Sequence, residues 1–130
     1  MKPYRGILSR FIYELERIKS RDYLIIVEGK KDKLALEELG LKNIFILHEK
    51  GRSLYERVEE IFALKKEVVF ILTDLDKKGR MLYIRIKQIL SENGVRLNDS
   101  LRYLLYKLRV TNVEGLSIFL NNYYKNSSKI

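Results

Sequence analysis

Three short, almost purely apolar runs rich in β-branched residues restrict the fold of this chain more than any other feature. They span residues 23–27, 44–47 and 68–72. A continuous apolar run of this length is typical of a strand buried on both faces, as in a parallel sheet covered by helices. Amphipathic segments with helical spacing alternate with the three runs. This alternation predicts an α/β fold with a parallel sheet.

Apolar spacing and end signals place helices between these strands. Ser53 with Glu56 three residues later forms a capping box, and Gly40 is a typical helix terminator. Residues 5–19 carry apolar side chains on one helical face, which predicts an N-terminal amphipathic helix. The expected helices span residues 5–19, 33–39, 53–64 and 80–92.

The last third of the chain predicts helices beyond the sheet. A short fourth strand is expected at residues 95–97, and a helix begins near Asp99 or Ser100. Thr111 and Glu114 suggest a second capping box before a last helix. Residues 121–130 are polar and are expected to fray. We expect one domain over residues 1–130, with a core at about 22–97, an N-terminal helix at about 5–19 and a helical extension at about 98–124.

Two scarce residue types limit the chemistry that this chain can perform. It has no cysteine, which excludes disulfides, zinc fingers, thiol catalysis and iron–sulfur clusters. Its single histidine is His48, which we interpret as a partly buried side chain rather than a catalyst. A metal site must therefore use oxygen ligands, which suit Mg²⁺, Mn²⁺ or Ca²⁺.

The charge of the chain indicates a polyanionic partner. Lys and Arg number 26 against 17 Asp and Glu, a net charge of +9. Such an excess retains nucleic-acid phosphates, although it also serves solubility alone. No apolar run approaches the roughly 20 residues of a membrane span, and the N-terminus lacks the apolar core of a secretory signal. We therefore expect a cytoplasmic protein that has nucleic acid, and no membrane, as its partner.

Acidic side chains follow two of the predicted strands. Glu28 comes directly after the first, and Asp74 and Asp76 follow the third. Ligands of open parallel sheets bind beyond the carboxyl ends of the strands, so these acids stand where a ligand is expected. If the first and third strands are neighbours, Glu28 approaches the Asp-x-Asp pair, and a divalent cation relieves the repulsion among the three carboxylates. We therefore predict Mg²⁺, or Mn²⁺, held by these acids.

Basic residues and glycines surround the same acids. Cations beside a metal suit a phosphate ligand, and Gly29 and Gly79 leave room for a close backbone approach. A lone acid after a strand is often only a helix cap or turn residue, which is our interpretation of Asp32, and lysines are often a solvated face. Tyr103 and Tyr106 would stack on bases if they are exposed. The predicted phosphate contacts are Gly29, Lys30, Lys31, Lys33, Lys77, Lys78 and Arg80.

Residues 27–32 and 72–80 together resemble the two signature motifs of Toprim domains, and the resemblance covers about residues 22–94. It implies a compact Rossmann-like sheet in which Glu28 acts as general acid or base and Asp74 and Asp76 hold Mg²⁺. Gly51 stands loosely where the family often has a glycine after the second strand, and we expect it, Gly79 and Asp32 to play supporting roles. The chain resembles most the small stand-alone Toprim proteins and the Toprim-type ribonuclease that matures 5S ribosomal RNA.

Three functions are compatible with this resemblance. A chain of 130 residues lacks the strand-passing body of a topoisomerase, and without cysteine it lacks the zinc-binding domain of a bacterial-type primase. The first function is a metal-dependent nuclease acting on structured RNA or DNA. The second is a module that binds nucleic acid or a ribonucleoprotein without cutting it. The third is a subunit of a larger primase-like or repair assembly.

Overall fold

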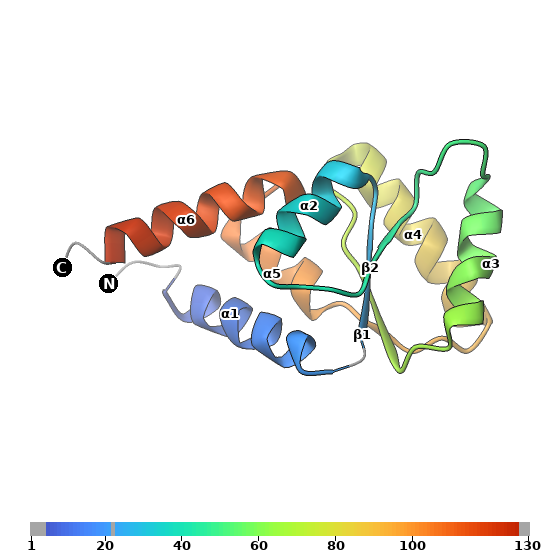
Figure 1. The fold of residues 1–130 in the computed structure, drawn as a ribbon, viewed down its shortest axis with the longest axis horizontal. Coiled ribbons are helices and arrows are strands. Elements are labelled where there is room, and N and C mark those ends of the chain that lie inside the picture. Colours follow the sequence, from blue (N-terminus) through green and yellow to red (C-terminus); the bar gives the residue numbers. More distant parts are fainter. Residues whose placement is uncertain (1–4, 22, 128–130) are drawn as a thin grey trace.

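The computed structural model describes residues 5–21 and 23–127, and its four parallel strands form one sheet flanked by helices (Figure 1). The predicted α/β fold with a parallel sheet of about four strands is confirmed. The strands lie side by side in the order β2-β1-β3-β4. Their bounds are Tyr23–Val27 for β1, Ile44–Ile46 for β2, Val68–Ile71 for β3 and Leu97–Asn98 for β4.

The neighbouring strands β1 and β3 form the centre of the sheet. Ile25 lies opposite Phe70 in their parallel register, and every residue of both strands is buried. From β1 the chain moves outward to β2 and then returns to the other side of β1 to form β3. The loops after β1 and β3 therefore leave in opposite directions at a topological switch point, where sheets of this kind bind their ligands.

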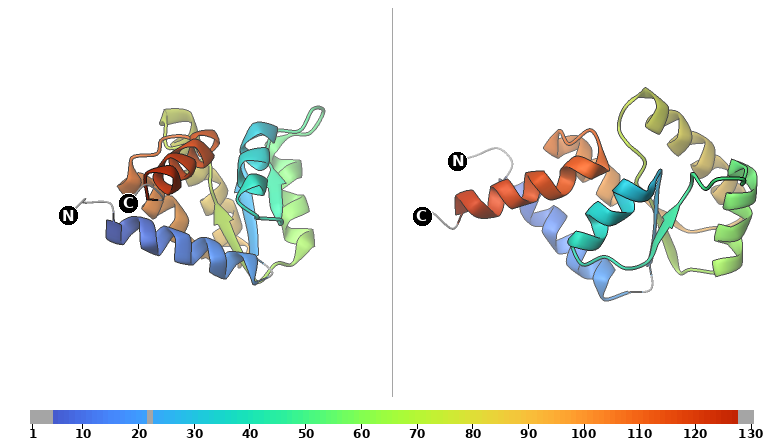
Figure 2. Two further views of the ribbon diagram at one scale, coloured as in Figure 1. Left: turned by 60° about the vertical axis from the view of Figure 1, so that its left-hand side comes forward. Right: turned by 45° about the horizontal axis from the view of Figure 1, so that its top comes forward.

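Helices cover both faces of the sheet (Figures 1 and 2). Side chains of alternate residues along a strand point to opposite faces, so Ile25 and Phe70 join one apolar cluster while Ile26 and Ile71 join the other. The first cluster takes side chains from α1 (Arg5–Lys19), α2 (Lys30–Glu38), α5 (Ser100–Leu108) and α6 (Leu116–Ser127). The second takes side chains from α3 (Leu54–Leu64) and α4 (Lys77–Glu92). No helix within residues 5–21 and 23–127 is long and apolar enough to cross a membrane.

Several element ends differ from the prediction because of local capping. Helices α2 and α4 begin three residues earlier than expected, since Gly29 and Asp76 are their N-caps. The second capping box is wrong, because the side chain of Asn112, not of Thr111, accepts the hydrogen bond that starts the 3₁₀ helix η1 (Val113–Gly115). The fraying expected from residue 121 is also wrong up to Ser127, where α6 ends, and residues 128–130 lie outside the described residues.

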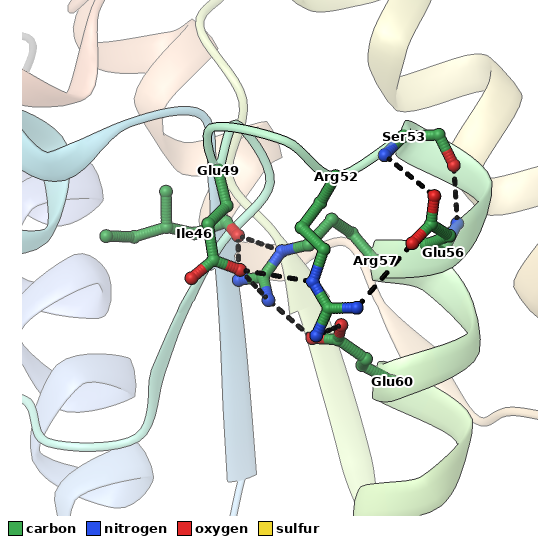
Figure 3. Close-up of polar contacts among 7 residues, drawn as sticks. All are labelled: Ile46, Glu49, Arg52, Ser53, Glu56, Arg57 and Glu60. Carbon is green, nitrogen blue, oxygen red and sulfur yellow. Dashed lines mark hydrogen bonds and ion pairs between the residues drawn. The ribbon is translucent and has the colours of Figure 1, made fainter.

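An arginine-centred cluster holds the loop between β2 and α3 against the edge of the sheet (Figure 3). Arg57 is buried over the ring of Phe45, 4.0 Å from its centroid, and its Nε and Nη2 donate to the carbonyl of Ile46. Its Nη1 also pairs with Glu49 at 2.8 Å. The guanidinium thus satisfies a carbonyl of the edge strand β2 that a further strand would otherwise bind.

Candidate functional site

The ends of β1 and β3 bring Glu28 and Asp74 into direct contact. Glu28 follows β1 immediately, and its Oε2 accepts a hydrogen bond of 2.7 Å from the backbone N–H of Asp74. Both side chains are half-buried at the carboxyl edge of the sheet. The pairing of β1 with β3, on which the predicted approach of these acids depended, is therefore present.

The C-terminal extension reaches over the same edge and binds the loop after β3. Oδ1 of Asp74 accepts a hydrogen bond of 3.0 Å from the backbone N–H of Val113. The N–H of the next residue, Leu75, donates to the carbonyl of Thr111 at 2.7 Å. Residues 111–113 thus fix both the side chain and the backbone of the Asp-x-Asp loop.

Asp76 lies at the start of α4, where it is exposed and serves as the N-cap. Its Oδ1 accepts a hydrogen bond of 2.8 Å from the N–H of Gly79. The loop is so tight that a Cβ atom on Gly79 would lie 2.0 Å from the carbonyl oxygen of Asp74. The buried hydroxyl of Thr73 donates to the carbonyl of Gly79 at 2.6 Å and closes the loop.

A buried arginine that the sequence does not mark as functional holds the loop after β3 in place. Arg102 of α5 donates from Nη1 to the carbonyl and hydroxyl oxygens of Thr73 at 2.5 and 2.9 Å, and from Nη2 to the carbonyl of Asp74 at 3.0 Å. Its guanidinium also lies over the ring of Tyr83, 4.4 Å from the centroid. Burial lowers the pKa of Arg102, and the nearby Glu28 and Asp74 oppose that change. In the sequence Arg102 is one cation in a leucine-rich helix, so no local signal marks its role.

Acidic side chains gather around the end of β1 at the carboxyl edge of the sheet. Asp32 is buried, and its Oδ2 accepts a hydrogen bond of 3.0 Å from the N–H of Gly29, the supporting contact of a helix-start residue. Burial raises the pKa of Asp32, and the charges of Asp74, Glu28 and Glu114 raise it further. Glu114, which the sequence suggested only as a capping residue, thus adds to a group of acids whose mutual repulsion favours a bound cation.

Comparison with known proteins identifies a family for this chain. The Toprim domain matches residues 23–101, which include both acidic loops.

This chain belongs to the Toprim domain family.

Archaeal relatives and one solved structure resemble the chain over most of its length. A UPF0292 protein of Methanocaldococcus jannaschii is 30% identical over 117 residues, which are 88% of this chain and 90% of that protein. A UPF0292 protein of Methanosarcina acetivorans is 31% identical over 91% of this chain and 85% of its own. The structure of a protein from Aquifex aeolicus matches with a TM-score of 0.71 and 34% identity, covering 82% of this chain and 95% of that one. The Toprim domain implies a metal-dependent function related to nucleic acid.

The basic residues predicted to meet phosphate gather at the starts of α2 and α4. Lys30, Lys31, Lys77, Lys78 and Arg80 are exposed in the first turns of these helices, and Lys33 is half-buried one residue beyond Asp32. A Cβ atom on Gly29 would meet no other atom within 4 Å, so the space beside this N-cap is open.

Gly51 and His48 lie in the loop between β2 and α3. Gly51 has a φ of 81° in the exposed loop before α3, a turn conformation that favours glycine. His48 is exposed, so its interpretation as a partly buried residue is wrong. Its backbone N–H donates to the carbonyl of Glu28 at 3.0 Å, so His48 stands beside the candidate site.

The donor set of this edge fits a hard divalent cation such as Mg²⁺. Within residues 5–21 and 23–127, no group of three or more His, Cys, Asp or Glu side chains is arranged to hold a metal ion. Glu28, Asp74 and Asp76 nevertheless each have one oxygen bound to a backbone N–H, and among the described residues no hydrogen bond engages the second. Mg²⁺ is usually bound by one or two carboxylates together with water and substrate phosphate, and this edge supplies the carboxylates.

The pKa of Asp32 makes a prediction about stability. Because folding raises the pKa of Asp32, ionisation of this side chain lowers the stability of the folded state. This loss of stability is absent below the unfolded carboxyl pKa of about 3.9. It grows as the pH rises, until the pH passes the raised pKa of the folded state. Asp32→Asn keeps an oxygen acceptor for Gly29 and removes the charge. We expect the variant to gain stability relative to the unmodified chain as pH rises from about 3 to 7, measured by urea unfolding in EDTA. Glu37→Gln, at an exposed position of the same helix, is the control, and an equal response of both variants would contradict the assignment.

Proposed function

We propose that this chain is a Mg²⁺-dependent nuclease that hydrolyses phosphodiester bonds of structured RNA or DNA. The contact between Glu28 and the loop of Asp74 at the switch point of the sheet supports this proposal most directly. This contact places the half-buried acids Glu28 and Asp74 beside the exposed cations in the first turns of α2 and α4. Phosphodiester hydrolysis needs both, because the acids serve the metal and the proton transfer while the cations hold the backbone.

The metal would be held by Glu28 and Asp74, with Asp76 as a further ligand. When bound, Mg²⁺ supplies neutralisation of the phosphate charge and activation of a water molecule. The backbone N–H groups that bind one oxygen each of Glu28 and Asp74 fix the direction of the second oxygen, so that the ligands are oriented before substrate arrives. The buried guanidinium of Arg102 keeps the Asp74 backbone in place.

Proton transfer is assigned to Glu28. Its carboxylate would take a proton from the water that attacks phosphorus and return it to the oxygen that leaves as the phosphodiester bond breaks. The lysines at the starts of α2 and α4 would bind the phosphates on either side of the broken bond, and the free N–H groups of these first turns add to the attraction. RNA processing is one setting in which such an activity would serve.

An assay with purified protein tests the proposal against its alternative. Labelled single-stranded, duplex and hairpin RNA and DNA are incubated with Mg²⁺, Mn²⁺ or EDTA, and binding of each is measured in parallel. We expect products only with a divalent metal. Binding that weakens steeply with salt, without product at any metal concentration, would instead indicate a non-catalytic nucleic-acid or ribonucleoprotein binding module, which the net charge of +9 favours.

The same assay addresses a protein partner. If this Toprim chain is one subunit of a primase-like or repair assembly, activity absent from the purified chain would appear when proteins that co-purify with it are added. We also propose that the protein is cytoplasmic, which fractionation of cells would test.

A further inference from the structure

A hollow between α4 and α5 opens beside the Asp-x-Asp loop. Its volume is about 380 Å³, within the range of small-molecule sites. Leu75, the residue between the two aspartates, is one of the residues that line the hollow. The first turns of α4 supply Arg80 and Ile84, and the hollow is therefore continuous with the proposed phosphate contacts.

Three tyrosines line this hollow and give it an aromatic wall. Tyr103 and Tyr106 lie three residues apart on one face of α5, and they are 51% and 67% exposed. Tyr83 of α4 is held in place, because its hydroxyl accepts a hydrogen bond of 3.0 Å from Lys87 and Arg102 covers its ring. Proteins that bind single-stranded nucleic acid usually stack the unpaired bases on exposed aromatic rings that lie beside cations.

The lining of the hollow includes cations that suit an anionic group. Arg80 and Arg102 both line the hollow. The guanidinium of Arg102 is already bonded to Thr73 and to the carbonyl of Asp74, so Arg80 is the lining cation that can meet a phosphate. Asp99 is the acidic residue in the lining, and the ammonium of Lys87 lies 2.7 Å from its carboxylate and offsets its charge. A ligand with a flat apolar body and a negative group at one end matches this distribution, and a nucleotide has that form.

We infer that this hollow binds an unpaired nucleotide of the substrate, with its base against Tyr103 and Tyr106 and its phosphate directed toward Arg80 and the acids. The inference rests on the proposed function and narrows its substrate to nucleic acid with a single-stranded or extruded base next to the cleaved bond. A base within a duplex is stacked on both sides and cannot enter such a hollow without leaving its pair. RNA and DNA share the recognised chemistry.

The test measures binding without cleavage. Single-stranded RNA and DNA oligonucleotides that contain one 2-aminopurine are titrated in EDTA, and fluorescence quenching reports stacking of that base on tyrosine. The variants are Tyr103→Ala and Tyr106→Ala. The controls are Tyr13→Ala and Tyr55→Ala, which remove tyrosines of similar or greater exposure from α1 and α3. We expect the first pair to weaken binding by roughly five-fold or more each and to abolish quenching, and the controls to change neither.

The outcomes separate this inference from the proposed function. Equal binding by all four variants, stronger binding of duplex than of single strand, or no binding of any oligonucleotide would overturn the inference. Cleavage that is unaffected by Tyr103→Ala and Tyr106→Ala would overturn it while leaving the nuclease intact. Quenching that depends on these tyrosines, without cleavage under any condition, would support the inference and overturn the nuclease.

Discussion

A Glu28→Gln variant is expected to keep its fold and to lose metal-dependent cleavage by about 10²- to 10⁴-fold, the usual contribution of a general acid or base. The amide oxygen of glutamine can still accept the hydrogen bond that the Asp74 N–H donates to Glu28, so the loop after β3 stays in place. What disappears is the carboxylate that would transfer the proton and bind the metal. Single-turnover cleavage with saturating Mg²⁺ measures the effect.

Metal binding provides a second measurement on the same variant. A cation that binds the folded state raises the unfolding temperature by mass action, so Mn²⁺ should stabilise the unmodified Toprim chain more than Glu28→Gln. Without metal the variant should be at least as stable, because it removes one charge from the group that includes Asp32 and Asp74. Glu37→Gln makes the same chemical change at an exposed position of α2 and should alter none of these properties. Wild-type cleavage by Glu28→Gln would refute the assignment.

Gly79→Ala is expected to destabilise the fold by more than about 3 kcal/mol, in the upper range of point substitutions. The added Cβ would lie 2.0 Å from the carbonyl oxygen of Asp74 and 2.6 Å from its carbonyl carbon. These atoms are backbone, and the hydrogen bonds from Thr73 and Arg102 hold that backbone in place. The loop must therefore open or α4 must lose its first turn.

Gly6→Ala is the matched control, because both glycines lie in the first turn of a helix. Among the described residues, no atom apart from its own local helix backbone would lie within 4 Å of a Cβ atom on Gly6, so alanine there should stabilise the protein slightly through helix propensity, by up to about 1 kcal/mol. Urea unfolding compares the two variants. A Gly79→Ala protein as stable as the unmodified chain would show that the loop does not hold this close approach.

The parts of the fold that the sequence predicts are those set by local chemistry. The apolar runs of β1 and β3 have one favourable environment, the interior of a covered parallel sheet, so strands and layers follow from them. The position of Glu28, Asp74 and Asp76 at the carboxyl edge of the sheet is predictable for a related reason, since polar residues that end such runs lie at that edge, where open sheets bind ligands. The sequence places the starts of α2 and α4 three residues late, because the charged residues after Gly29 and Asp76 are typical of turns, whereas these two residues are the N-caps.

The supporting contacts of the site were beyond sequence reasoning because they join distant segments. Arg102 looks like an ordinary cation of an amphipathic helix, and only packing of α5 against the sheet brings it under Thr73. The hydrogen bond to Asp74 comes from the backbone N–H of Val113, which nearly any residue type could supply, so the sequence does not indicate it. Glu114 adds its charge to Asp32 only through the same tertiary approach.

The hydrogen bonds from residues 111–113 to the loop of Asp74 also determine when the site can form during synthesis. Because synthesis proceeds from the N-terminus, β1 and β3 leave the ribosome before residues 111–113, and the strands that end in the acids can pair first. At that stage Asp74 lacks its Val113 partner and the loop lacks Arg102. A nascent chain therefore carries Glu28 and Asp74 before the contacts that hold the Asp74 loop exist, and the candidate site takes its full form only when Arg102 and residues 111–113 dock.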